Sequence, residues 1–315
     1  MIGIDVGGAN LKVVDDNGVH IHYCPLWEQA PITGILKLYA QKNCNAAVVM
    51  SGELADCFQN KMQGISFIVD AVQKAFPDAR FYGTDGSFHD GAVPELAAAN
   101  WLASADYLRS RHPTAVLLDI GSTTADIIPL ARFADLLGLT DTQRLQKGYL
   151  IYTGMLRTSI PTLIRSVNLS GIVTPVSTEY FAASADVHLV LGHIGTKGYT
   201  CDTPDRKEKS IAASLRRLAR VVCADLKEIG EEGATDIARQ FWKVQRDLVC
   251  NHVKMISKEN DTQKLIIAGT GASLFARELG GMDLTEELGR FADALPAFAV
   301  REVSAGRNLI SESDN

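Results

Sequence analysis

The chain has 315 residues, of which 46% are hydrophobic and 22% are charged, a composition that excludes a disordered or collagen-like protein. Its formal net charge is −6 and it has no basic tract, so nucleic acid is not an expected partner. No window reaches the roughly 18 consecutive apolar residues of a membrane helix, and the first residues lack a signal-peptide pattern, so no membrane partner is expected. The six cysteines are scattered, which favours reduced thiols, several of them in the core, and a cytoplasmic location.

Short β-branched runs and turn signals open the chain. Residues 2–6, 11–14 and 19–23 predict three strands, joined by a glycine turn and by Asn17-Gly18, a strong hairpin signal, so they form a β-meander. Farther on, the apolar periodicity predicts helices over 32–41, 62–75 and 93–110 and strands over 46–50 and 80–82. We expect the last of these helices to cross between two halves of the molecule.

The initial pattern then repeats. Residues 115–121 and 125–130 predict a strand, a small-residue turn and a second strand, with Asp119 in the place that Asp5 holds in the first pattern. The duplication predicts two α/β domains, residues 1–113 and 114–315. Within the second, we expect strands over 188–191 and 265–268, helices over 207–227 and 236–256, loops over 140–148 and 197–209, and a frayed tail over 312–315.

Three predicted strands end in small-residue turns, two of which begin Asp-x-Gly. Glycine lets the backbone approach an anion, and serine or threonine hydroxyls add donors, while a strand-end carboxylate suits a divalent cation. The third turn opens a helix, whose N-terminal N–H groups suit a further phosphate. A single turn of this kind is more often a plain hairpin, but three in order favour phosphate binding. The candidate phosphate-binding residues are Gly7, Gly8, Asn10, Gly121, Ser122, Thr123, Thr124, Gly269 and Gly271.

These turns resemble those of the sugar kinase, heat-shock chaperone and actin superfamily, and the details are nearer to its hydantoinase A/oxoprolinase-like branch. Segments 4–12, 51–54, 98–101, 119–126 and 152–158 resemble the methanofuran-biosynthesis synthases, a group also described as proteins of tetrahydromethanopterin-linked C1 transfer. This resemblance covers nearly the whole chain. Its most specific piece is Tyr152-Thr153-Gly154-Met155-Leu156-Arg157-Thr158.

The resemblance implies two duplicated ribonuclease H-like domains, of the actin-like ATPase and sugar kinase kind, with the ligand in the cleft between them. It also implies a transferase that joins [5-(aminomethyl)furan-3-yl]methyl diphosphate to the phenol of γ-glutamyltyramine, or of a tyrosine analogue, and releases diphosphate. Expelling diphosphate needs chiefly electrostatic help, which backbone N–H groups, Lys12 and a metal ion supply. We therefore expect Mg²⁺ (with Mn²⁺ as the alternative) and do not expect ATP as a cofactor.

Four residues are candidate catalytic groups, namely Asp5, Asp119, Glu53 and Lys12. Asp5 and Asp119 are expected metal ligands, together with Asp126, which needs a partner if it is buried in its apolar strand. Asp119 and Glu53 are both candidate bases for the phenol. The ordinary alternatives are a turn-capping carboxylate for either aspartate, a helix-start carboxylate for Glu53 and a solvated lysine for Lys12.

Arg157 is a candidate ligand for diphosphate or for a glutamyl carboxylate, because its planar fork suits either; a surface salt bridge is equally expected. Trp101 is expected in the core, and segment 201–206 favours a plain surface loop over one that closes on substrate. Two other functions stay open. One is an ATP-dependent small-molecule kinase or amide-hydrolysing relative, and the other is a non-enzymatic nucleotide-sensing module. A homo-oligomer is also left open.

Overall fold

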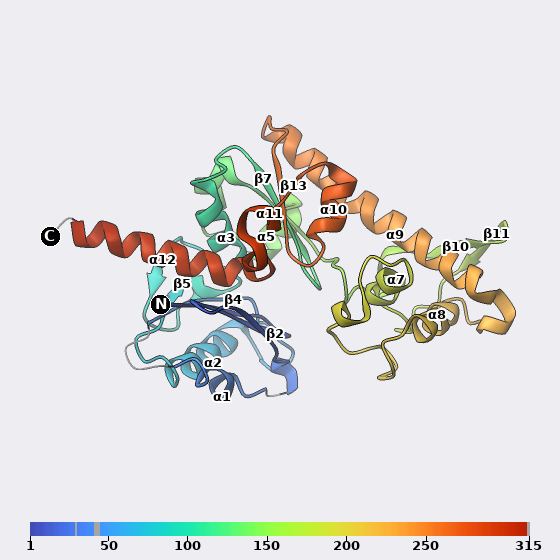
Figure 1. The fold of residues 1–315 in the computed structure, drawn as a ribbon, viewed down its shortest axis with the longest axis horizontal. Coiled ribbons are helices and arrows are strands. Elements are labelled where there is room, and N and C mark those ends of the chain that lie inside the picture. The colour runs from blue at the N-terminus through green and yellow to red at the C-terminus, as the bar shows by residue number, and fades with distance from the viewer. Residues whose placement is uncertain (29, 41–44, 314–315) are drawn as a thin grey trace.

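Two mixed sheets organise the computed structural model, which describes residues 1–28, 30–40 and 45–313, with side chains to residue 306 (Figure 1). In spatial order, the first sheet contains β3 (Gly18–Tyr23), β2 (Asn10–Asp15), β1 (Ile2–Val6), β4 (Ala46–Met50), β5 (Arg80–Tyr82) and β6 (Phe88–His89). The second contains β13 (Met282–Asp283), β12 (Leu265–Ala268), β7 (Val116–Ile120), β8 (Ala125–Pro129) and β9 (Leu150–Ile151). A separate hairpin pairs β10 (Ser166–Leu169) with β11 (Ile172–Pro175).

The two sheets share one topology. In the first, β1, β2 and β3 form an antiparallel meander, and β4 and β5 run parallel to β1 on its other side. In the second, β7, β8 and β9 form the meander, and β12 and β13 lie parallel on the other side of β7. The predicted duplication is confirmed, and the fold is a pair of ribonuclease H-like sheets. β1 and β4 are buried throughout, as expected for central parallel strands covered on both faces.

Helices cover the sheets and fill the space between them. The α-helices are α1 (Ile32–Leu36), α2 (Lys61–Gln73), α3 (Asn100–Arg109), α4 (Phe133–Leu136), α5 (Asp141–Lys147), α6 (Ile160–Leu163), α7 (Ser184–Val190), α8 (Ile211–Arg220), α9 (Leu226–Glu259), α10 (Ala272–Leu279), α11 (Thr285–Leu288) and α12 (Leu295–Ser313). Short 3-10 turns are η1 (Leu26–Glu28), η2 (Pro94–Leu96), η3 (Leu130–Arg132), η4 (Thr196–Gly198) and η5 (Gly289–Ala294).

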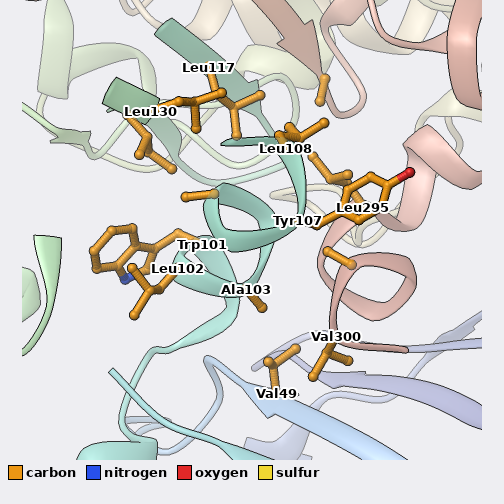
Figure 2. Close-up of a cluster of buried hydrophobic side chains, with 14 of the residues drawn as sticks. Val49, Trp101, Leu102, Ala103, Tyr107, Leu108, Leu117, Leu130, Leu295 and Val300 are labelled. Atoms are coloured by element: carbon orange, nitrogen blue, oxygen red, sulfur yellow. The ribbon is translucent and has the colours of Figure 1, made fainter. Parts of the chain in front are cut away.

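One hydrophobic core lies between the two sheets, around α3 and α12. It joins Val49 of β4 to Leu117 of β7 through Leu102 of α3, and Leu295 and Val300 of α12 complete it (Figure 2). The contact between α12 and β1 is so close that a Cβ atom on Gly3 would lie 1.9 Å from the carbonyl oxygen of Ala297. The C-terminal helix therefore packs on the N-terminal sheet, and the predicted boundary between residues 113 and 114 stays a prediction.

A second body of helices stands beside the sheets. It contains α7, α8, the β10–β11 hairpin and the first part of α9, at the right of Figure 1. Buried side chains that include Leu218 and Phe241 give this body its own hydrophobic cluster. Because α9 runs from this body to the face of the second sheet, it fixes the body relative to that sheet.

Several predicted elements are wrong. Residues 188–191 belong to α7 and its end rather than to a strand, because a short apolar run does not by itself distinguish a strand from a buried helix. Residues 141–147 form α5 instead of a loop, and the helix predicted over 93–110 begins only at Asn100. The helix predicted over 32–41 ends at Leu36, and residue 41 lies outside the described residues.

Three smaller expectations concern the termini, the membrane and the thiols. The tail predicted over 312–315 is helical as far as Ser313, and residues 314–315 lie outside the described residues. Across the described chain, no helix is long and apolar enough to cross a membrane. Among the five cysteines that the structure describes, all are free thiols, and Cys24 alone is buried, so the expectation of several core cysteines is wrong; Cys44 lies outside the described residues.

Candidate active site

The first two predicted turns have the same geometry in the two halves. In the first, the Gly7 amide donates to the carbonyl of Asn10 at 3.0 Å; in the second, the Gly121 amide donates to the carbonyl of Thr124 at 2.9 Å. Each turn follows a central strand that carries a carboxylate, Asp5 on β1 or Asp119 on β7. A Cβ atom on Gly8 would meet no atom within 4 Å, so space is open above the first turn.

The third predicted turn joins the second, and it too has a counterpart in the first half. The Gly271 amide donates to the carbonyl of Ile120 at 3.1 Å, as the Gly52 amide does to Val6 at 3.1 Å. Gly269 has a φ of +83°, and a Cβ atom there would lie 2.4 Å from Oδ1 of Asp119. Only glycine fits this close approach, which brings the third turn against the strand-end carboxylate.

The two strand-end carboxylates lie close enough to influence each other electrostatically. Burial raises the pKa of Asp5 to about 6, and the charge of Lys12 opposes this rise. Burial also raises the pKa of Asp119 to about 7, with further raising by Asp126 and Asp5 and lowering by Lys12. Oδ1 of Asp5 is buried without a hydrogen-bond partner among the described residues. An unpaired buried carboxylate oxygen facing a second carboxylate fits a divalent cation.

The neighbours of these carboxylates differ between the halves. Asp5 pairs across the strands with Lys12, and Asp119 pairs at the equivalent position with Asp126. Nζ of Lys12 donates to the carbonyl of Asp293 at 3.1 Å, so Lys12 is held at the site instead of being free in solvent. Asp126 is bound by Arg144.

Arg144 was missed by the sequence analysis because its helix, α5, was expected to be a loop. Its guanidinium is 3% exposed, binds Asp126, contacts Asp141 at 2.7 Å and lies 4.3 Å from the ring centroid of Trp101. The Thr140–Gln143 capping box at the start of α5 is the sequence signal that identifies this helix. Trp101 is buried, as predicted.

Asp5, Asp119 and Asp126, the three predicted metal ligands, do not form one three-residue metal site among the described residues. Within the described part of the chain, no three His, Cys, Asp or Glu side chains form a group that could hold a metal ion. Arg144 supplies the partner that a buried Asp126 needs. The metal role of Asp126 stays a prediction, and Asp5 and Asp119 are the pair that fits a cation shared with a phosphate group.

Glu53 is a buried carboxylate in the loop after β4. It is 2% exposed, and Oε2 has no hydrogen-bond partner among the described residues. Burial raises its pKa, and the backbone N–H of Ala98 and the charge of Lys61 are among the lowering influences. The following helix, α2, is capped by Asn60 instead, so Glu53 is not a helix-start carboxylate.

The segment 152–158, the most specific piece of the family resemblance, covers the second turn. Met155 donates its amide to the carbonyl of Gly121 and Arg157 donates to that of Ser122, both at 2.9 Å. Gly154 packs so closely that its Cβ atom would lie 2.5 Å from the amide nitrogen of Thr123. The Arg157 guanidinium lies 4.9 Å from the ring centroid of Trp27, and no described carboxylate lies within ion-pair distance of it.

A buried polar network supports segment 152–158, and the sequence did not predict this network. Gln245 of α9 donates to Oγ1 of Thr153 and to the carbonyl of Gly154, both at 2.9 Å. Its Oε1 accepts from Nε2 of His188 at 3.0 Å. Burial lowers the pKa of His188 to about 3, so the imidazole is neutral and structural at physiological pH.

Comparisons with known proteins agree with the sequence motifs. The profile of the hydantoinase/oxoprolinase family matches residues 45–300. A (4-{4-[2-(gamma-L-glutamylamino)ethyl]phenoxymethyl}furan-2-yl)methanamine synthase from Methanocaldococcus jannaschii is 33% identical over 319 residues, which cover 96% of this chain and 97% of the relative. A protein of the same name from Methanococcus vannielii is 36% identical over 172 residues, 55% of this chain and 78% of the relative.

Solved structures of similar fold were also found. An activator of the 2-hydroxyisocaproyl-CoA dehydratase from Clostridium difficile, with bound ADPNP, aligns over 98% of this chain and 97% of its own, with 12% identity and a TM-score of 0.43. A ROK family glucokinase from Streptomyces griseus aligns over 94% and 97%, with 12% identity and a TM-score of 0.40.

Proposed function

Because this chain belongs to the hydantoinase/oxoprolinase family, and because a synthase named for an aryl ether product matches it over nearly its whole length, we propose that it is a transferase of methanofuran biosynthesis. Its substrates are [5-(aminomethyl)furan-3-yl]methyl diphosphate and the phenol of γ-glutamyltyramine. The bond from the furfuryl-type carbon to diphosphate breaks, and the phenol oxygen forms a bond to that carbon. The phenol proton passes to a carboxylate. The near full-length match to that synthase carries this proposal.

The turns and the cations beside them bind and orient the diphosphate. The open space above Gly8 and the hydroxyls of Ser122 and Thr123 receive its oxygens, and Lys12 faces them from β2. Asp5 and Asp119 would hold a Mg²⁺ ion, which would supply further stabilisation of the negative charge on the leaving group. Because these groups are fixed before reaction, they stabilise the departing diphosphate without reorganisation.

Two carboxylates remain candidate bases for the phenol, and their variants behave differently. If Glu53 is the base, Glu53→Gln lowers kcat about 10²-fold or more and leaves the binding of inorganic diphosphate unchanged. If Asp119 is the base and also a metal ligand, Asp119→Asn lowers kcat and weakens diphosphate binding that depends on Mg²⁺. Steady-state kinetics together with calorimetric titration of diphosphate distinguish the two assignments.

The proposed reaction is tested with the purified chain, both substrates and Mg²⁺. We expect release of inorganic diphosphate and an aryl ether of the summed mass minus diphosphate, with no product when the phenol is omitted. In a thermal-shift screen, a ligand at a hundredfold its Kd stabilises the protein by about 2.7 kcal/mol. Stabilisation by ATP or ADP alone, without ether formation, contradicts the proposal and favours a kinase or a nucleotide-sensing module.

A further inference from the structure

Three partly exposed aromatic side chains from distant segments are influenced by Arg157, one through a ring contact and two through its charge. Tyr23 is 46% exposed, Trp27 is 37% exposed and Tyr180 is 51% exposed, in a chain whose other aromatic rings are mostly buried or packed on one another. The ring of Trp27 lies 4.9 Å from the Arg157 guanidinium. Burial raises the pKa values of Tyr23 and Tyr180, and the nearby charge of Arg157 lowers both. This aromatic cluster, Tyr23, Trp27 and Tyr180, thus draws on both halves of the molecule.

A cavity of about 280 Å³ adjoins the aromatic cluster. Its lining residues are Glu28, Asp202, Thr203, Arg206, Lys207 and Lys209. The hydroxyl of Tyr23 donates to Oδ2 of Asp202 at 3.2 Å, and Glu28 follows Trp27 directly, so the cavity and the cluster share a border. Within the described chain, none of the three cations of the lining has a carboxylate at ion-pair distance. Against these three cations the lining has two carboxylates, Glu28 and Asp202, so its net charge is positive.

A buried ion pair holds the cavity in place. Arg217 of α8 is fully buried and donates to Asp186 at 2.8 Å and to Asp205 at 3.1 Å. Oγ1 of Thr203 donates to the carbonyl of Lys207 at 2.9 Å, which closes the loop on itself. The backbone of the loop is thus held before any ligand binds, and a preorganised loop loses less free energy on ordering.

The cluster also leads to the second turn. The amide of Arg157 donates to the carbonyl of Ser122 at 2.9 Å, and Sγ of Cys201 contacts the carbonyl of Leu156 at 3.8 Å. The cavity, the aromatic cluster and the second turn are therefore linked through contacts of Asp202 with Tyr23, of Arg157 with Trp27 and of Arg157 with Ser122. A molecule with an anionic group at one end and an aromatic ring at the other matches this order.

We propose that this face is the acceptor subsite, which takes a phenol with a carboxylate-bearing tail. The ring packs on the aromatic cluster with its hydroxyl toward the second turn, and the carboxylate binds among Arg206, Lys207 and Lys209. The inference rests on the proposed function and names where its second substrate binds. It also assigns segment 201–206, expected to be a plain surface loop, to substrate recognition.

Calorimetric titration of the acceptor alone, without diphosphate donor, tests the subsite. We expect the wild-type chain to bind γ-glutamyltyramine at least about tenfold more tightly than tyramine, which lacks the carboxylate, because hydrogen bonds to charged groups favour the former. The double substitution Arg206→Gln and Lys209→Gln removes this preference, whereas Lys254→Gln, an exposed lysine on α9, preserves it. Trp27→Ala weakens the binding of both ligands alike.

Two outcomes overturn the inference. One is equal binding of the two phenols by the wild-type chain, and the other is a double variant that keeps the preference but loses affinity for inorganic diphosphate, which would make the cavity part of the donor site. Failure of the proposed function gives a different pattern. In that case the wild-type chain still prefers γ-glutamyltyramine and the double variant still lacks this preference, but no ether forms when the donor is added.

Discussion

The two strand-end carboxylates have different residues opposite them on the neighbouring strand. Asp5 faces a cation across the strand, Lys12, whereas Asp119 faces a carboxylate, Asp126. Burial raises the pKa of Asp5 to about 6 and that of Asp119 to about 7; Lys12 opposes both rises, and Asp126 adds to the second. Burial is the largest cause of both rises, and a cation that these carboxylates would hold binds more tightly once both are ionised.

Replacing Asp5 should stabilise the metal-free chain at high pH. The native pKa of about 6 lies above the ordinary value of 3.8, so the native state binds more protons than the unfolded state between these values. The stability that this carboxyl contributes is present below pH 3.8 and is lost as pH rises through 6. We expect Asp5→Asn to raise the free energy of unfolding by at most about 3 kcal/mol at pH 8, and not at pH 3.

Urea unfolding with a chelator present measures this difference. The exposed Asp78→Asn variant is the matched control and should show no such change with pH. A gain from Asp5→Asn that persists at pH 3 contradicts protonation as its origin.

At the scale of elements, the second turn depends on the segment that covers it. Carbonyls of the turn are occupied by amides of residues 155–157, and α9 secures that segment through Gln245. The turn is therefore held by a helix that is distant in sequence, as the diphosphate site proposed above requires.

Gly154→Ala should disturb the turn without touching a ligand. The added Cβ atom would lie 2.5 Å from backbone at Thr123, so the turn must shift, and overpacking of this kind costs about 1–3 kcal/mol. We expect the affinity for inorganic diphosphate with Mg²⁺ to fall about tenfold or more, as measured by calorimetry. Gly195→Ala, where no atom lies within 4 Å of the new Cβ, is the control. Unchanged affinity in the Gly154 variant contradicts the role of this contact.

At the scale of the whole molecule, the two sheets share a core. α3 and α12 both lie in it and join the two sheets, although each half also has a hydrophobic cluster of its own (Figure 2). The two sheets should therefore unfold in a single cooperative transition.

Gly3→Ala tests this shared core. Its Cβ atom would lie 1.9 Å from the carbonyl oxygen of Ala297, a backbone atom, and so would separate α12 from β1. We expect a loss of about 2 kcal/mol or more in urea unfolding, still in one transition. Gly34→Ala in α1 has only an ordinary contact at 3.5 Å and should be neutral or slightly stabilising. Two separate transitions in the Gly3 variant contradict a single cooperative unit.

The sequence allowed the longer strands of both sheets and the paired turns to be predicted, because short strand-turn signals are local, whereas the short strands β6, β9, β10, β11 and β13 were missed. It did not place Arg144 or Gln245 at the site, since their positions depend on how α5 and α9 pack against distant segments. The aromatic cluster escaped prediction for the same reason: Tyr23 and Tyr180 are far apart in the chain, and nothing near either one indicates the other.

The position of α12 also bears on the order of events during synthesis. β1 is synthesised before the other elements of this fold, yet the helix that packs against it, α12, is synthesised after all of them. Domains generally fold from the N-terminus as the chain emerges. Part of the apolar face of the first sheet is therefore uncovered until α12 has been synthesised. The face of β1 that α12 covers, on the strand that carries Asp5, therefore stays exposed until residues 295–313 have been synthesised.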